Sequence, residues 1–218
     1  MHDILLVDKP AGMTSFGVVA RLRRVLSQQE GKKVKVGHTG TLDPFATGLM
    51  IIVTGKECKN AATYTKLDKV YEATFRLGET STTGDPEGDI THYSNHVPSH
   101  TEVERALHEF TGEISQRPPI FSAIKINGQR AYKLARNGQE IELPLRTVTI
   151  YELKLIEYAY PELRVRAHVS SGTYIRSLGV DIGERLGTGA YCSELRRMAI
   201  GKWGVSSAKQ LTEFGVQS

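Results

Sequence analysis

Apolar and polar residues change their spacing several times along the 218-residue chain, and each spacing predicts a different element. Five consecutive apolar residues at 49–53 predict a buried strand. Alternation over 70–77 and over 163–169 predicts half-buried strands, the second with one apolar and one basic face. Shorter runs predict strands over 4–7 and 148–156. Apolar residues at helical spacing predict three helices, over residues 18–26, 103–110 and 175–186.

Capping and turn residues set the expected ends of these helices. The expected N-terminal signals are Ser15 for the first helix, the capping-box pair Ser99 and Glu102 for the second, and Ser171-Gly172-Thr173 for the third. Glycines are expected to end the same helices, at Gly31, Gly112 and Gly187.

The order of the elements indicates the fold class. Strands and helices are mixed without strict strand–helix–strand alternation, which favours an α+β fold with a largely antiparallel sheet. Residues 80–95 are polar and predict a loop or an irregular hairpin. A turn at Asn127-Gly128 is expected to precede a short helix through Tyr132 and Leu134. The length predicts one medium domain or two small ones, and of these we expect one domain over residues 1–218.

Composition narrows the class of protein. Lys and Arg number 28 against 24 Asp and Glu, and this net charge of +4 is compatible with a nucleic-acid partner. Cys58 and Cys192 are far apart and form no C-x-x-C pattern, which favours a reducing cytoplasm over a disulfide framework. No apolar run approaches the length that spans a membrane, and the N-terminal run is expected to be a strand, not a signal peptide.

Several common kinds of site find little support in the sequence. His92, His96 and His100 are spaced by four, but Pro98 and the polar residues around them predict loop histidines, not a metal site. The segment 85–89 is interpreted as a turn because its residues do not match a calcium loop. Phosphate-binding and dinucleotide-binding glycine motifs are missing from the sequence. We therefore expect no metal and no nucleotide cofactor.

The segment Gly37–Gly48 is the strongest candidate for chemistry. Its three glycines and one proline within twelve residues predict a tightly specified loop that can approach a ligand closely. It contains one imidazole, His38, and one carboxylate, Asp43. Asp43 could cap its own turn ahead of a proline, or it could act as a nucleophile or base. The second role requires a nearby cation, which Arg176 could supply from the start of the last helix.

Two further features could serve an RNA ligand. Tyr71 lies on the apolar face of its predicted strand, so it is either a core tyrosine or a platform that stacks on a base. Basic segments could contact phosphates or could be solvated surfaces, at Lys32-Lys33-Val34-Lys35, Arg164 with Arg166, and Arg196-Arg197.

Five separated motifs resemble one known family. They are Asp8-Lys9-Pro10-x-Gly12, Gly37-His-Thr-Gly-Thr-Leu-Asp-Pro-x-Ala-Thr-Gly48, Asp68-Lys-Val-Tyr71, Tyr132-Lys-Leu-Ala-Arg136 and Ser171-Gly-Thr-Tyr-Ile-Arg176. In this order they closely resemble the TruB family of bacterial tRNA pseudouridine-55 synthases, from about residue 3 to about residue 204. The resemblance implies a pseudouridine synthase fold with a mainly antiparallel sheet and an RNA-binding cleft. It also implies isomerisation of the T-loop uridine at position 55 of tRNA, without a cofactor.

The resemblance implies a role for each matching residue. Asp43 is the expected catalytic carboxylate, and Arg176 is expected to pair with it. Tyr71 is expected to stack on the target uracil and to help with the proton lost from C5. His38 is expected to help displace the target base. The residues expected to line the base pocket are Tyr174 and Leu195.

One departure and two rival interpretations remain. Typical relatives carry a C-terminal RNA-binding PUA domain, whereas this sequence stops at Ser218, so we expect a short form. It is expected to act on the tRNA T-arm as a monomer, without a membrane or a protein partner. The rivals are an RNA-binding folding helper that has lost catalysis, and a catalytic subunit guided by a separate RNA. Intact Asp43, Tyr71 and Arg176 count against the first, and the shortened C-terminus counts against the second.

Overall fold

A computed structural model describes residues 4–120, 125–126, 129–130 and 143–216. The elements follow one another along the chain as β1 (Ile4–Lys9), α1 (Ser15–Gln29), β2 (Val36–His38), β3 (Thr47–Thr54), η1 (Gly55–Asn60), α2 (Ala61–Thr65), β4 (Lys69–Leu77), β5 (Glu79–Ser81), β6 (Ile90–His92), α3 (His100–Glu109), β7 (Gly112–Gln116), β8 (Lys125–Ile126), β9 (Gln129–Arg130), β10 (Arg146–Ala159), β11 (Glu162–Val169), α5 (Ile175–Leu186), β12 (Ala190–Ile200), β13 (Trp203–Gly204), η2 (Val205–Ser207) and η3 (Leu211–Phe214).

The chain forms two compact units, which are described separately below. Unit 1 comprises Met1–Glu72 and Leu195–Ser218, and unit 2 comprises Ala73–Glu194. Strands β4 and β12 each contribute a segment to both units. The expectation that residues 1–218 act as one catalytic domain stays a prediction.

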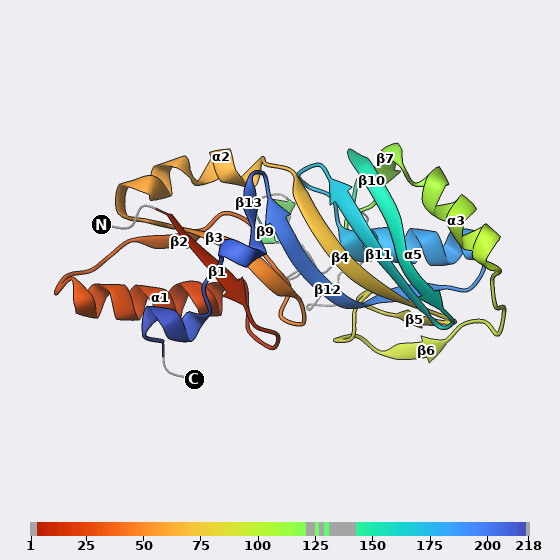
Figure 1. Cartoon of the computed structure of the whole chain (residues 1–218), viewed down its shortest axis with the longest axis horizontal. Helices are drawn as coiled ribbons and strands as arrows, with labels where there is room; N and C mark the ends of the chain where they lie inside the picture. The colour runs from red at the N-terminus through yellow and green to blue at the C-terminus, as the bar shows by residue number, and fades with distance from the viewer. Residues whose placement is uncertain (1–3, 121–124, 127–128, 131–142, 217–218) are drawn as a thin grey trace. The chain divides into compact units, whose positions relative to one another are not determined.

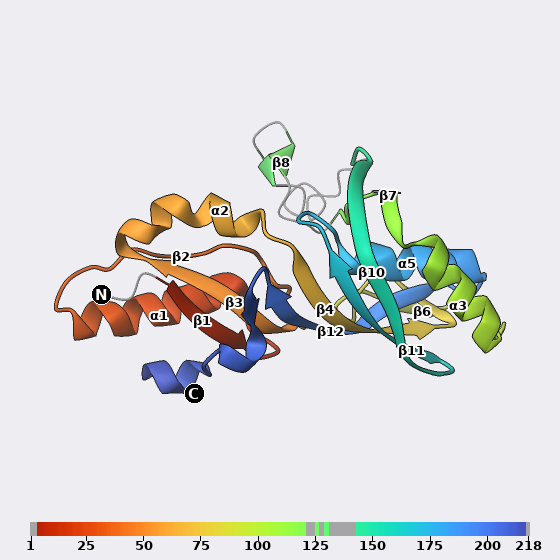
Figure 2. The same cartoon turned by 45° about the horizontal axis from the view of Figure 1, so that its top comes forward.

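Unit 1 is built around β3. This strand pairs antiparallel with β1 and β2 and parallel with β12, and β13 pairs antiparallel with β12. Helices α1 and α2 lie on opposite sides of these strands (Figures 1 and 2). Both faces of β3 are therefore covered, and the predicted buried strand at 49–53 is confirmed. One side of the core gathers Leu49, Ile51, Val53 and Ile200.

Unit 2 contains the other part of the sheet, in the order β4-β11-β10-β7. Strands β10 and β7 pair antiparallel, as do β10 and β11. Helices α3 and α5 pack against each other beside these strands (Figure 2). The predicted α+β class with a largely antiparallel sheet is confirmed, although β3 and β12 pair parallel.

Two of the expected helix caps are wrong by one or more residues. The N-cap of α1 is Thr14, whose hydroxyl accepts from the Gly17 N–H at 2.9 Å, while Ser15 is already helical. The N-cap of α5 is Tyr174, which makes no side-chain capping bond. In both cases the chain offers several adjacent capping residues, and tertiary contacts select among them. The capping box of Ser99 and Glu102 is confirmed.

Three further predictions concern the segment 80–95, the end of the second helix and the segment 127–136. Residues 80–95 contain an irregular hairpin, because β5 pairs antiparallel with β6. The helix α3 ends at Glu109, three residues before Gly112, which opens β7 with a φ of +105°. The expected turn at Asn127-Gly128, the helix through Tyr132 and Leu134, and the whole motif 132–136 lie outside the described residues.

Both cysteines are thiols. The Cys58 thiol donates to the Val53 carbonyl, and that of Cys192 donates to the Glu194 carbonyl. Among the described residues, no helix combines the length and the apolar character needed to cross a bilayer.

Asp181 on α5 gives a prediction for the pH dependence of stability. Burial, and secondarily the charge of Glu184, raises the pKa of its carboxyl from 3.8 to about 6. The unfolded chain therefore loses this proton first, so stability falls as the pH rises from about 4 to 6 and the full cost persists above. We expect Asp181→Asn to raise the melting temperature at pH 8 and to have no such effect at pH 4.

Glu184→Gln is the matched variant for this prediction. It removes the smaller of the two causes, so its stabilising effect at pH 8 should be smaller than that of Asp181→Asn. A gain from Asp181→Asn that is equal at both pH values would contradict the assignment.

Candidate active site

The loop between β2 and β3 carries Asp43 and is held on both sides of that residue. The Ser15 hydroxyl donates to the Leu42 carbonyl at 2.8 Å and accepts from the Leu42 N–H at 2.8 Å. On the other side, the Lys9 ammonium donates to the Pro44 carbonyl at 3.1 Å. Ser15 is 2% exposed and Lys9 is fully buried. Asp43, which is half-buried, thus lies between two anchored residues.

Arg197 of β12 holds the preceding part of the same loop. Its guanidinium donates to the carbonyls of Leu49, Thr41 and Gly40 at 2.7, 3.3 and 3.2 Å. The residue is 1% exposed, and three carbonyl dipoles compensate its buried charge. The basic pair Arg196-Arg197 is therefore not a free RNA-binding surface: Arg197 organises the loop, and Arg196 pairs with Asp8 at 2.7 Å.

Gly48 makes this arrangement possible. Its φ is +106°, and a Cβ there would lie 2.4 Å from the Arg197 carbonyl oxygen. We expect Gly48→Ala to lower the free energy of unfolding by about 3 kcal/mol or more, because backbone strain adds to the steric clash.

The control for Gly48→Ala is Gly31→Ala, measured by the same denaturant titration. Gly31 also has a positive φ, +65°, but a Cβ there would meet no atom within 4 Å. Its cost should be about 1 kcal/mol, from the backbone alone. Equal losses for the two variants would show that the close approach to Arg197 is unimportant.

The other predicted site residues of unit 1 are His38, Tyr71 and Leu195. His38 ends β2 and is half-buried, directly before the anchored loop. Tyr71 on β4 is 7% exposed, and its hydroxyl makes no hydrogen bond to any residue that the structure describes. Leu195 on β12 is 8% exposed. The buried phenol of Tyr71 is suited to donate a hydrogen bond to a bound ligand.

Unit 2 contains Arg176 and Tyr174, together with a carboxylate that the sequence did not single out. Arg176 is 5% exposed, and its Nη1 donates to Asp85 Oδ2 at 2.7 Å and to the Thr83 carbonyl at 3.0 Å. Asp85 is 2% exposed, and its other oxygen accepts from the Thr83 hydroxyl at 2.6 Å and the Glu87 N–H at 3.0 Å. The segment 85–89 is a turn as predicted, and it also supplies a buried ion pair.

Tyr174 is fixed through its backbone. The Gln116 side-chain amide donates to the Tyr174 carbonyl at 3.0 Å, and the Gln116 amide oxygen accepts from the Tyr174 N–H at 2.8 Å. Gln116 is 1% exposed. A single glutamine at the end of a strand gave no signal in the sequence, because its partner is 58 residues away.

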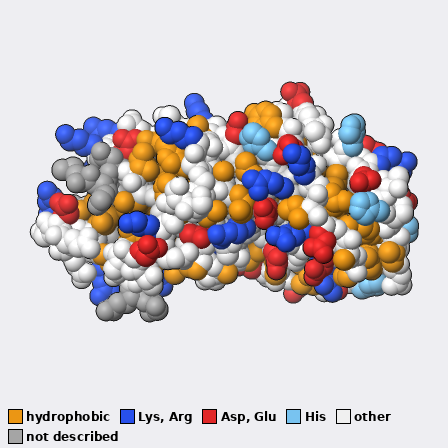
Figure 3. All heavy atoms as spheres, in the orientation of Figure 1, with side chains coloured by type: hydrophobic (Ala, Val, Ile, Leu, Met, Phe, Trp, Pro, Cys, Tyr) orange, Lys and Arg blue, Asp and Glu red, His pale blue; other side chains and the backbone are white. Residues whose placement is uncertain are grey.

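The expected basic face of β11 carries acidic neighbours. Arg164 lies opposite Glu157 in the β10–β11 register, and Arg166 lies opposite Lys154. The Lys154 ammonium in turn pairs with Glu152 at 2.6 Å. Acidic and basic side chains are interspersed over β10 and β11 (Figure 3). This face therefore offers weaker electrostatic attraction to RNA than its arginines alone suggest.

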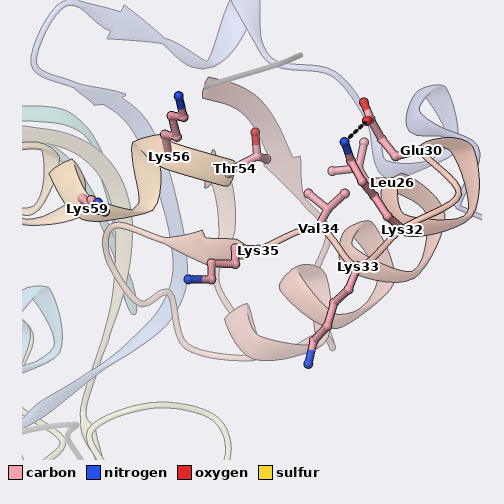
Figure 4. A pocket seen from close by; sticks show the side chains of 10 residues that line it. Leu26, Glu30, Lys32, Lys33, Val34, Lys35, Thr54, Lys56 and Lys59 are labelled. Carbon is pink, nitrogen blue, oxygen red and sulfur yellow. Dashed lines mark ion pairs between the residues drawn. The ribbon is translucent and has the colours of Figure 1, made fainter.

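A hollow of about 370 Å³ in unit 1 is lined by several lysines (Figure 4). Leu26 and Val34 contribute apolar surface, and Glu30 pairs with one of the lysines at 3.7 Å. The lysines that line it are Lys32, Lys33, Lys35, Lys56 and Lys59. The five lysines and one glutamate that line the hollow carry a net charge of +4. This equals the net charge of the whole chain, so the charges of all other residues cancel.

The histidines of the 92–100 segment do not form a metal site. His92 lies on β6, His96 in the following coil, and His100 is the first residue of α3. Within the described ranges, no three His, Cys, Asp or Glu side chains gather as a metal would require.

Comparison with known proteins identifies the family of this chain. A family model described as TruB family pseudouridylate synthase (N terminal domain) matches residues 23–175. The chain belongs to the TruB family. Pseudouridylate synthases are isomerases, so the predicted family and enzyme class are both confirmed.

Curated relatives in the TruB family are similar over nearly the whole chain. A tRNA pseudouridine synthase B of Phocaeicola vulgatus is 46% identical over 202 residues, 91% of this chain and 86% of the relative. One of Cupriavidus metallidurans is 41% identical over 220 residues, 100% of this chain and 68% of the relative. A crystal structure of a Cbf5–Nop10–Gar1 complex is 31% identical with a TM-score of 0.72, over 96% of this chain and 52% of that chain. The present chain thus spans about half of that solved chain.

Proposed function

We propose that this TruB-family protein isomerises the T-loop uridine at position 55 of tRNA to pseudouridine, with Asp43 as the essential carboxylate. The observation that carries the proposal is the anchored Asp43 loop, in which Ser15 and Lys9 bond the residues on either side of the carboxylate. The names of the curated relatives support tRNA as the substrate. Such anchoring gives a reacting group the positional precision that catalysis needs.

The reaction is balanced without a co-reactant. The bond between N1 of uracil and C1′ of ribose breaks, the base turns, and C5 forms the new bond to C1′. The proton leaves C5, and N1 carries a proton in the product. One carboxylate can serve this sequence as a nucleophile or as a base, and both roles require its ionised form. We therefore expect no metal, nucleotide or redox cofactor.

The neighbouring residues would bind the extruded base. Tyr71 offers an aromatic face for stacking and a hydroxyl without a partner in the described protein. His38 would occupy the place that the base leaves, and Tyr174 and Leu195 would line the pocket. Stacking of this kind contributes about 1–3 kcal/mol per base, which offsets the cost of extrusion.

Arg176 would hold the charge of Asp43. A guanidinium carries five N–H donors in a planar fork, enough to serve two carboxylates at once. The ion pair with Asp85 fixes one end of this fork. We assign Asp85 the role of orienting the Arg176 guanidinium, a positioning role that the sequence did not indicate.

The remaining proposals concern the binding partner, the oligomeric state and the cellular location. The lysine-lined hollow supports a polyanionic substrate such as the T-arm, since counterion release from phosphates dominates such affinity. We propose that the chain acts in the cytoplasm as a monomeric catalytic domain, without a protein partner.

The test is incubation of the purified chain with an unmodified tRNA transcript, followed by mapping of pseudouridine at single-nucleotide resolution. We expect one product, at position 55, and none in a transcript carrying cytidine there. The free transcript also tests the rival interpretation of a catalytic subunit guided by a separate RNA, because no guide RNA is present. Product at other positions only, or no product, would overturn the proposal.

A further inference from the structure

The outward face of α1 carries an aromatic side chain that the core does not use. Phe16, in the first turn of the helix, is 66% exposed, the highest value among the exposed large hydrophobic side chains of the described residues. Ala20 and Arg24 follow at helical spacing and are also exposed, as is Arg21. The opposite face of α1 supplies buried residues to the core. Phe16 therefore contributes little to folding.

This face begins beside the anchored loop of unit 1. Ser15, the residue before Phe16, bonds both backbone groups of Leu42, which directly precedes Asp43. The Gly12 N–H donates to the Pro44 carbonyl at 2.8 Å, just after Asp43. Since consecutive Cα atoms are about 3.8 Å apart, the start of α1 and the carboxylate loop are immediate neighbours.

The charge on the same face fits a nucleic acid. The sequence of α1 contains three arginines and no acidic residue. Arg23 turns toward β2 and donates to the Val36 carbonyl at 3.1 Å. Arg21 folds back onto the Gly17 carbonyl at 3.4 Å, near Phe16. Neither Arg21 nor Arg24 forms an ion pair with any acid in the described parts of the chain.

We propose that the outward face of α1, formed by Phe16, Arg21 and Arg24, binds the RNA strand beside the target uridine. Phe16 stacks on an unpaired loop base, and the two arginines contact phosphates. RNA is favoured over a protein partner because an aromatic side chain interleaved with unpaired arginines complements both parts of a single strand, base and phosphate. The inference rests on the proposed function, since it places the substrate by the Asp43 loop.

The test measures the binding of a fluorescently labelled, unmodified T-arm stem–loop to the full chain between 50 and 200 mM salt. We expect Phe16→Ala to raise Kd about tenfold, within the range that base stacking provides, and Phe16→Trp to restore it. We expect Arg21→Gln with Arg24→Gln to reduce the slope of log K against log salt by about 1.5, as two lost phosphate contacts require. All variants should keep the wild-type melting temperature.

Tyr93→Ala is the matched control, because Tyr93 is a 59%-exposed aromatic residue of unit 2. It should leave Kd unchanged. The inference is overturned if the Kd of Phe16→Ala stays within twofold of wild type, or if Tyr93→Ala raises Kd as much as Phe16→Ala does. An unaltered salt slope in the double arginine variant would overturn it as well. If the wild-type chain makes no pseudouridine, the proposed function fails. If it makes pseudouridine but Phe16→Ala leaves RNA binding unchanged, only the inference fails.

Discussion

Replacing Asp43 by asparagine is expected to lower pseudouridine formation by about 10³-fold or more while tRNA still binds. Asparagine keeps the size of the side chain and its turn-forming capacity, so the anchors at Leu42 and Pro44 should survive. It removes the negative charge that either catalytic role requires. Single-turnover conversion of tRNA and a separate binding titration together measure the two effects.

The control for this prediction is Asp89→Asn, which neutralises an exposed carboxylate in unit 2 and should leave the rate unchanged. The folded state of the Asp43→Asn variant is checked by its melting temperature. Normal turnover in that variant would contradict the central role of Asp43. A loss of tRNA binding equal to the loss of rate would also count against it, since the carboxylate would then serve binding alone.

The second large effect is expected at Asp85. Asp85→Asn leaves an oxygen to accept from Thr83 and Glu87, but it removes the negative charge that lies 2.7 Å from the buried Arg176 guanidinium. Removing one partner of a buried ion pair costs about 3–5 kcal/mol. We therefore expect a loss of that order in the free energy of unfolding, together with a slower reaction.

A double-mutant cycle separates the pair from its members. Arg176→Met alone leaves Asp85 buried and uncompensated, so it should destabilise the fold as well. The double variant should lose less free energy of unfolding than the two single variants together. The reason is that neither buried charge then remains without the opposite charge of its partner. Strictly additive losses would show that the two side chains do not interact. Asp89→Asn, four residues away, again serves as the exposed control.

The sequence predicted the elements better than their ends. Buried and alternating runs located β3, β4 and β11, because burial on one or two faces imposes a period on the sequence. The caps at Thr14 and Tyr174 were missed, because neighbouring hydroxyls compete and Ser15 is occupied by a contact 27 residues away. Local signals carry no information on such long-range contacts.

The supporting residues of the site show the same limit. The resemblance supplied Asp43, Tyr71 and Arg176 as candidates, but a basic dipeptide at 196–197 read as a surface patch, although Arg197 is buried beneath the loop. Similarly, the sequence suggested Arg176 only as a cation for Asp43, and it gave no signal of the buried ion pair with Asp85. What a buried cation bonds to depends on strands brought together by the fold.

The most direct test of the account follows the C5 hydrogen of a single uridine. A tRNA transcript labelled with tritium at C5 of position 55 alone is mixed with excess purified chain, without guide RNA or added cofactor. The account predicts release of one tritium per tRNA by the wild-type chain and none by Asp43→Asn under conditions where both bind. Retention of the label by the wild type, or equal release by both proteins, would contradict it.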